Sequence, residues 1–454
     1  MMTNTLLTHG EERFDQHARF SMLADAIERM CRPGETVLSA FSGEQSDFIR
    51  FNAGKVRQSG WVEQARITLR LIHGSRQAYS TFDLGGDAHA DMSDVSEALS
   101  VLRESLLDAS DDPHLLFDAG AWTRSTRRDG RLPDPEALVE LVAHSTRGLD
   151  FVGFYAGGMV SRGFASTTGS RGWYEVKNFN FSGSFHQPNG MAIKTTYAGD
   201  AWDDAVFAGK VREAAGRLPV LLRAPRVLKP GGYRAWLAPS ALAELLKSTA
   251  WDGFSARAQA SSTSPLYKLH TGAARFDERV SLAESLELGI SPAFNDDGYL
   301  RASVPLISAG RGVGQLTSAR SAREYGLEPN GALAQEMPTS LAMASGDLAQ
   351  DDVLARLDTG LYIGNLWYVN FSDRMNCRLT GMTRFATFWV EGGEIVAPVD
   401  AMRFDDSLYG LFGERLEALG AQSDMMLSDS TWGQRATGGL QLPGALVKSF
   451  ELVL

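Results

Sequence analysis

Residues 48–58 read F-I-R-F-N-A-G-K-V-R-Q, a pattern that predicts an antiparallel hairpin. Two short runs of strand-forming residues flank Asn52-Ala53-Gly54, which is a typical turn signal. Further along, Ile67, Leu69 and Leu71 alternate with polar residues, so one face of this strand is buried and the other faces water. The sequence therefore predicts an antiparallel meander in the first part of the chain.

Helices are expected on both sides of this meander. Apolar residues recur at helical spacing over residues 15–30, and Pro33-Gly34 ends that helix. Another strand is expected at residues 77–82, followed by a second helix with one apolar stripe, formed by Val95, Leu99, Leu102 and Leu106. Residues 1–112 are thus predicted to form an N-terminal α+β unit.

A second α+β unit is expected over residues 113–227, after Asp112-Pro113. Asp134 caps a helix that holds Pro135 in its first turn, where the missing amide hydrogen is harmless. Alternating aromatic and polar residues predict strands within residues 151–197, and Asp200 is expected to cap a helix reaching residue 215. The arginine-rich residues 124–131 are interpreted as a solvated loop.

The third predicted unit, residues 228–454, is rich in short strands separated by glycine turns. It opens with a strand at residues 233–238 and a helix at residues 239–250. A further helix is expected at residues 347–357, capped by Asp347, and a terminal strand at residues 444–454. The predicted fold class is α+β, with two N-terminal α+β units followed by a β-rich C-terminal domain.

The composition is that of a soluble globular protein, with 454 residues, 44% of them hydrophobic, and a formal net charge of −11. No apolar run approaches the roughly 18 residues that span a bilayer. Residues 1–10 lack a signal-peptide core, so a cytoplasmic protein without membrane contact is expected. The negative charge disfavours direct nucleic-acid binding. The two cysteines, Cys31 and Cys377, form no C-x-x-C motif, which excludes a thiolate zinc cluster.

Several stretches, in this order and spacing, resemble the TldD/PmbA family, also called modulators of DNA gyrase. Residues 48–58 are similar to the family's N-terminal strand signature, and residues 153–172 to its middle region. Asn295-Asp296-Asp297-Gly298 and residues 360–363 resemble C-terminal landmarks. Residues 388–395 resemble a strand-turn-strand that ends in E-N-G-x-I, with Gly392 in place of asparagine.

This resemblance implies a barrel-like C-terminal sheet, a dimer and a metallopeptidase assembly. In the family the catalytic member, TldD, holds zinc with the two histidines of H-E-x-x-x-H and a cysteine close to the C-terminus. The companion, TldE or PmbA, lacks these ligands and pairs with TldD. The assembly is thought to cleave peptides or small unfolded proteins, including a microcin precursor and an antitoxin.

The zinc ligands do not carry over to this chain. The helix at residues 239–250 reads P-S-A-L-A-E-L-L-K-S-T-A, and the histidine positions hold Ala243 and Ser248. The motif glutamate is retained as Glu244. Trp432 lies where the cysteine ligand is expected. A catalytic zinc needs about three protein ligands, so no metal site and no cofactor are expected in this chain, and zinc is expected only in a TldD-type partner.

Other residues carry alternative interpretations. Glu244 could act as a general base without zinc, with His270 as its partner in the same cleft. Trp367, Tyr368 and Phe371 lie on an aromatic strand that belongs either to the core or to a peptide or partner contact. The role of Cys377 stays open.

Three functions follow from these readings, and the sequence leaves enzymatic activity undecided. The first is the non-catalytic, TldE-like subunit of a TldD/TldE-type peptidase, paired with a TldD-like chain or with itself. The second is an autonomous hydrolase with a site that uses no zinc. The third is a scaffold that modulates another enzyme, such as DNA gyrase.

Overall fold

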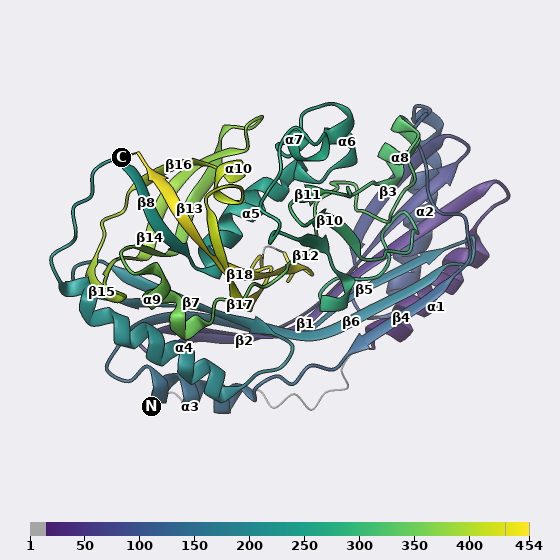
Figure 1. Cartoon of the computed structure of the whole chain (residues 1–454). Coiled ribbons are helices and arrows are strands. Elements are labelled where there is room, and N and C mark those ends of the chain that lie inside the picture. The colour runs from purple at the N-terminus through teal and green to yellow at the C-terminus, as the bar shows by residue number, and fades with distance from the viewer. Residues whose placement is uncertain (1–14, 432, 454) are drawn as a thin grey trace.

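The computed structural model describes residues 15–431 and 433–453 of the chain. Its first half is built on one sheet of seven strands, named here the N-terminal sheet, in the order β3-β2-β1-β5-β6-β4 with β7 beside β6; all its pairings are antiparallel except that of β4 with β6. This sheet curves along the lower side of the molecule in Figure 1. Its strands are β1 (Glu35–Asn52), β2 (Lys55–His73), β3 (Arg76–Asp83), β4 (Thr123–Arg128), β5 (Asp150–Ser166), β6 (Arg171–His186) and β7 (Ala192–Gly199).

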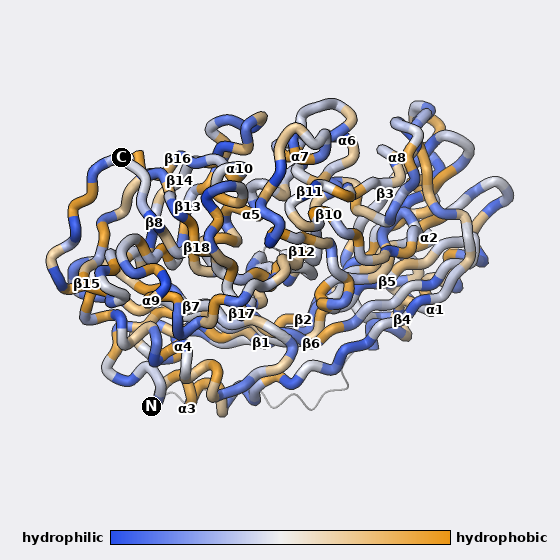
Figure 2. The backbone as a smooth tube through the Cα atoms, viewed as in Figure 1, coloured by the Kyte–Doolittle hydropathy of each residue, from blue (hydrophilic) through white to orange (hydrophobic). Residues whose placement is uncertain are grey.

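The predicted hairpin is confirmed, because Asn52 pairs with Lys55 across a turn at Ala53 and Gly54. Both turn residues have positive φ, 49° at Ala53 and 68° at Gly54, as a two-residue hairpin turn requires. The tube of this sheet carries both hydrophobic and hydrophilic segments in Figure 2, and along β6 Phe179, Phe181 and Phe185 alternate with polar residues. One face of the sheet therefore packs on helices, and the other is left for the C-terminal half.

Helices α1 (Gln16–Met30) and α2 (Ala88–Asp108) pack on one end of this sheet through a cluster that includes Leu23, Leu69 and Leu99. Asp15 caps α1 by accepting from the Ala18 amide at 2.9 Å, which places the start of this helix where it was expected. Helices α3 (Pro135–Ser145) and α4 (Asp204–Arg217) share a second, aromatic cluster with β5 and β6. The cap of α3 by Asp134 is confirmed.

Two expectations in this half are wrong. The arginine-rich segment is β4, which pairs in parallel with β6 from Thr123–Arg171 to Arg128–Val176. Its backbone is satisfied by this ladder, while most of its arginine and threonine side chains stay at the surface. Helix α4 is capped by Asp203, which accepts from two backbone amides, and not by Asp200.

The second half contains an eleven-stranded sheet, the C-terminal sheet, wrapped around helix α5 (Pro239–Gly253). Its strands are β8 (Gly231–Leu237), β9 (Leu282–Glu284), β10 (Val304–Ser308), β11 (Arg311–Gly312), β12 (Ser340–Met343), β13 (Gly360–Asp373), β14 (Arg378–Glu391), β15 (Glu394–Pro398), β16 (Arg403–Ser407), β17 (Leu416–Leu427) and β18 (Gly439–Leu452). The short helices are α6 (Ala256–Ala260), α7 (Tyr267–His270), α8 (Ala319–Tyr325), α9 (Val353–Leu357) and α10 (Leu408–Leu411), with 3-10 turns at Leu218–Leu222, Leu286–Leu288 and Gln350–Asp352.

This sheet is β-rich as predicted but is not a regular barrel. The pairings β18–β16, β16–β14, β14–β13, β13–β8 and β8–β18 close a ring of five strands, and the other strands extend from it. The ring is weakest between β16 and β18, where Phe404 and Leu452 form the single paired position. The helix expected at residues 347–357 is wrong: a 3-10 turn precedes the short α9, and Asp347 caps neither.

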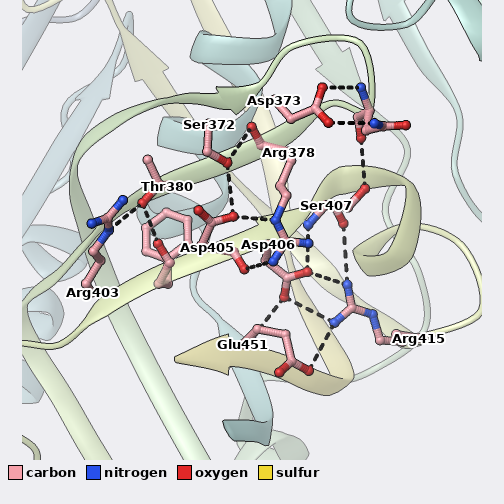
Figure 3. Close-up of polar contacts among 12 residues, drawn as sticks. Ser372, Asp373, Arg378, Thr380, Arg403, Asp405, Asp406, Ser407, Arg415 and Glu451 are labelled. Carbon is pink, nitrogen blue, oxygen red and sulfur yellow. Dashed lines mark hydrogen bonds and ion pairs between the residues drawn. The ribbon is translucent and has the colours of Figure 1, made fainter. Parts of the chain in front are cut away.

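A polar network reinforces the weak side of the ring (Figure 3). The Asp406 carboxylate, 1% exposed, accepts from the Ser407 amide at 2.7 Å and from the Glu451 amide at 3.0 Å. It also forms an ion pair with Arg415. Beside it, Arg378 pairs with Asp405 at 2.5 Å. These contacts tie the last strand to β16 where the backbone ladder is sparse.

The boundary expected near residue 112 falls among the strands of one sheet, because β3 lies before it and β4 to β7 after it. The division into units 1–112, 113–227 and 228–454 stays a prediction. Among the described residues no helix combines the length and apolar character needed to cross a membrane.

Candidate functional site

Helix α5 carries the positions that the resemblance assigns to zinc. It starts directly after β8 with Pro239 in its first turn, and Ala238 at its cap offers no side-chain hydrogen bond. Its apolar residues are buried in the main cluster of the C-terminal half. Trp251 and Asp252 leave helical geometry at its end, with φ of 62° at Asp252.

The three candidate positions on this helix point to different surroundings. Ala243 is 1% exposed and belongs to the core. The Glu244 side chain is 37% exposed and pairs with the Lys247 ammonium at 3.2 Å, three residues along the helix. The Ser248 hydroxyl donates to the carbonyl oxygen of Val369 at 3.4 Å. Trp432, the fourth position, lies outside the described residues.

The residues that the structure describes do not fit a zinc ion at this helix. A methyl group in the core supplies no donor atom, the Ser248 hydroxyl is directed at a backbone carbonyl, and the one carboxylate is engaged by a lysine. In the described part of the chain, no three side chains of His, Cys, Asp or Glu type lie close enough to share a metal.

The hypothesis of a Glu244–His270 pair is not supported by the geometry. His270 lies in α7 and interacts with the Gly253 carbonyl at the far end of α5. Gly253 is nine residues beyond Glu244, which corresponds to about 13 Å along a helix. Burial lowers the pKa of His270, with the Gly253 contact acting in the opposite direction. This imidazole is therefore a half-buried group at the end of α5, away from Glu244.

Cys377 is also a core residue. It is fully buried, next to Thr249 at 3.8 Å, and burial raises the pKa of its thiol to about 12. A thiol is nucleophilic only as the thiolate. The structure therefore places Cys377 among packing groups.

The aromatic strand is β13, and its rings are divided between two environments. The Trp367 and Tyr368 side chains are 48% and 78% exposed, and the Arg384 guanidinium lies 4.1 Å from the centre of the Trp367 ring. Tyr368 has φ of 59°, a strained value for a bulky residue. Phe371 is half-buried beneath Arg374. The Ser248–Val369 hydrogen bond shows that β13 and α5 are neighbours.

The segment at residues 428–438 contributes a residue that the sequence did not single out as functional. Its described residues, 428–431 and 433–438, contact the N-terminal sheet at Ser428 and Gly433, and the Arg435 side chain, 4% exposed, is buried against the same sheet. The guanidinium donates to Ser46 Oγ at 3.2 Å and to the Asn178 backbone oxygen at 3.1 Å. The Arg435 amide donates to Glu44 at 2.8 Å.

Further contacts hold the same segment. Asn180 Nδ2 donates to the Ser428 oxygen at 2.7 Å, and Gln64 Nε2 to the Gly433 oxygen at 2.7 Å. Polar residues of the N-terminal sheet thus hydrogen-bond to a loop of the C-terminal half. No local sequence signal announces this, because the partners lie more than 200 positions away.

A family model for the PmbA/TldA metallopeptidase C-terminal domain matches residues 230–453. No curated protein matches the sequence.

Three solved structures share the fold over nearly the whole chain. A crystal structure of TldE from Thermococcus kodakarensis is 16% identical, has a TM-score of 0.77, and is matched over 94% of this chain and 100% of its own. A proposed modulator of DNA gyrase from Bacteroides thetaiotaomicron is 14% identical, with a TM-score of 0.74 and coverage of 96% and 98%. A proposed modulator of a DNA gyrase from Thermotoga maritima is 14% identical, with a TM-score of 0.73 and coverage of 96% and 99%.

Proposed function

Because this chain belongs to the TldD/PmbA family, we propose that it is the non-catalytic, TldE-like subunit of a two-chain zinc peptidase. In this proposal a TldD-like partner supplies the zinc and the water that attacks the peptide bond. This chain completes the assembly and helps to hold the peptide.

The observation that carries the proposal is the donor set on α5. A helix that resembles a metallopeptidase motif presents a core methyl at Ala243, a hydroxyl at Ser248 that is bonded to Val369, and Glu244 paired with Lys247. The match to the PmbA/TldA domain and the fold shared with a protein named TldE give further support.

We also propose that Trp367 and Tyr368 contact the partner subunit or its peptide. They are large, exposed and next to α5. Rigid aromatic side chains contribute strongly to interfaces at low entropic cost. The strained φ of Tyr368 is consistent with a position maintained for contact rather than for packing.

Metal analysis and a peptidase assay test the main proposal. The chain is purified alone and together with a homologue that carries H-E-x-x-x-H, and zinc and peptide cleavage are measured for each. We expect stoichiometric zinc and cleavage only in the complex. Stoichiometric zinc in the isolated chain would contradict the proposal.

Glu244→Gln in this chain is the matched variant. It keeps the size of the side chain and removes the charge, and the complex is expected to retain full activity. Cleavage by the isolated chain that disappears in Glu244→Gln would instead favour the autonomous hydrolase.

A further inference from the structure

A cavity of about 270 Å³ lies between the N-terminal sheet and the turn Asn295-Asp296-Asp297-Gly298. Strands β1, β2 and β3 form one wall, and the segment 333–335 another. The turn is fixed in place, because the Asp118 amide donates to the Asp297 oxygen at 2.9 Å and Trp122 Nε1 donates to the Gly298 oxygen at 2.7 Å. The cavity is therefore formed by rigid elements.

Two guanidinium groups, Arg70 and Arg162, and two carboxylates, Asp296 and Asp297, lie at or near this cavity. Arg70 donates to Asp297 Oδ1 at 2.5 Å, so the charges of these two side chains neutralise each other, and it also donates to Gln77 Oε1 at 2.8 Å. Arg162, the other nearby cation, directs its guanidinium to the Ser161 oxygen at 2.7 Å and to the Arg435 oxygen at 3.5 Å.

Asp296 is the carboxylate of this group that has no direct partner, and Arg162 and Arg70 act on it only at longer range. Within the described part of the chain, no hydrogen bond or ion pair engages its carboxylate, although the side chain is open to the cavity. Surrounding protein raises the pKa of this carboxyl by desolvation, and the adjacent Asp297 raises it further, while Arg162 and Arg70 offset this only in part. A cation bound beside a carboxylate in such surroundings stabilises its charged form.

We propose that this cavity binds the basic side chain of a peptide, with Asp296 as the counter-charge of an ammonium or guanidinium group. Leu38, Ala40, Leu333 and Ala334 line the cavity and provide apolar surface for the methylene stem. The proposal deepens the proposed function, because it names the class of peptide that this subunit holds, and it rests on that function only for the peptide nature of the ligand.

A metal ion fits the cavity less well. Calcium takes six to eight oxygen ligands, and magnesium requires near-octahedral geometry. Asp297 is already paired with Arg70, and the described residues offer no group of three acidic or His/Cys side chains that could share an ion. An elongated cation with an apolar stem uses both the carboxylate and the apolar wall.

The test uses the isolated chain and three probes: the N-acetyl methylamides of lysine, arginine and norleucine. Norleucine has a similar stem to lysine and no charge. Calorimetry or NMR titration is expected to show binding of a basic probe, with norleucine about five-fold weaker, as the loss of a charge pair that water still reaches implies. Asp296→Asn is expected to abolish this preference.

Asp83→Asn is the matched control, because it removes the same charge from a side chain that is 75% exposed on β3. It should leave binding unchanged. Equal weakening by both variants, equal binding of norleucine, absence of any binding, or competition by calcium or magnesium alone would each overturn the proposal. This test uses no partner subunit, so its failure is distinct from failure of the zinc experiment. Circular dichroism checks that each variant is folded.

Discussion

Asp406 and Asp296 are both aspartates near arginine side chains, the first buried in the C-terminal ring and the second exposed at a cavity beside the N-terminal sheet. Asp406 accepts from two backbone amides and pairs with Arg415, so each of its oxygens has a partner. Asp296 has no such partner among the described residues and opens into a cavity. The first carboxylate is saturated by its own chain, and the second has bonding capacity left for a ligand.

Bonding and exposure together separate the structural acid from the proposed binding acid, which the sequence pattern does not. Both residues belong to Asp-Asp pairs, at 296–297 and 405–406. In each pair one aspartate forms an ion pair with an arginine: Asp297 with Arg70, and Asp405 with Arg378. The pairs differ at the other aspartate. Arg415 forms an ion pair with Asp406, whereas no arginine of the described residues forms one with Asp296.

Replacing Asp406 should have the largest effect on stability. Asp406→Asn leaves the Arg415 guanidinium with only the longer 3.6 Å pair to Glu451 and removes the charge that the Ser407 and Glu451 amides bind, and breaking such a buried pair costs up to about 3 kcal/mol. Chemical unfolding of the variant measures this loss. Asp405→Asn, at a carboxylate 19% exposed and paired with the more open Arg378, should cost no more than about 1 kcal/mol. Equal losses in the two variants would contradict the assigned role of Asp406.

Glu336 extends the comparison to a saturated acid without a cation. It is fully buried and accepts from Ser255 Oγ at 2.6 Å, the Arg257 amide at 2.9 Å and the Ser318 amide at 2.8 Å. These contacts link the caps of α6 and α8. Glu336→Gln loses charge-assisted bonds and should cost about 2 kcal/mol in unfolding experiments.

The pH dependence of this contribution has a defined sign. Burial would raise the pKa of Glu336, but hydrogen bonds from Ser255, Arg257 and Ser318 outweigh it and lower the pKa. The carboxylate therefore stabilises the fold above its unfolded pKa, and this stability is lost as the pH falls through the lower, folded value. The stability difference between wild type and Glu336→Gln should shrink as the solution is acidified. A difference that grows on acidification would contradict this account.

Arg435 tests whether the loop over the N-terminal sheet is held by its side chain. Arg435→Met removes the bonds to Ser46 and Asn178 and should weaken the local structure by about 1–2 kcal/mol. Hydrogen exchange should accelerate in residues 433–438 and stay unchanged in β18. Accelerated exchange throughout β18 would indicate a wider role.

Replacing Asp296 should have the smallest effect on stability, with the opposite sign from Asp406. Because its folded pKa is raised, the charged form is disfavoured in the fold, and stability falls as the pH rises from the unfolded value through the folded one. Asp296→Asn at neutral pH should leave the unfolding free energy unchanged or increase it slightly. A clear loss would mean that Asp296 has a structural partner.

Much of the fold could be predicted because its signals are local. Asp134 announces a helix through a cap that reaches only two or three residues ahead, and α1 is announced by apolar residues at helical spacing. Ala53-Gly54 announces the hairpin because the turn needs positive φ. The strand at residues 123–128 was missed because its arginines and threonines lack apolar alternation, and its pairing with β6 lies about 48 positions away.

The candidate site was only partly predictable for the same reason. The absence of zinc ligands at Ala243 and Ser248 can be read from the sequence, and their actual surroundings in the core and against Val369 cannot. The distance between Glu244 and His270 depends on how α5 and α7 pack. The partners of Arg435, and the missing partner of Asp296, depend on contacts between the two halves.

The place of β18 in the ring has a consequence for synthesis on the ribosome. Strand β8 emerges early in the C-terminal half, yet its antiparallel partner is β18, from Leu237–Ala445 to Gly231–Leu452. Until that strand has been translated, the edges of β8 and β12 have no β18 to pair with. These strand edges therefore stay without β18 for most of the translation of this half. Unpaired edges favour aggregation, so we expect chaperones that shield them to assist the folding of this chain.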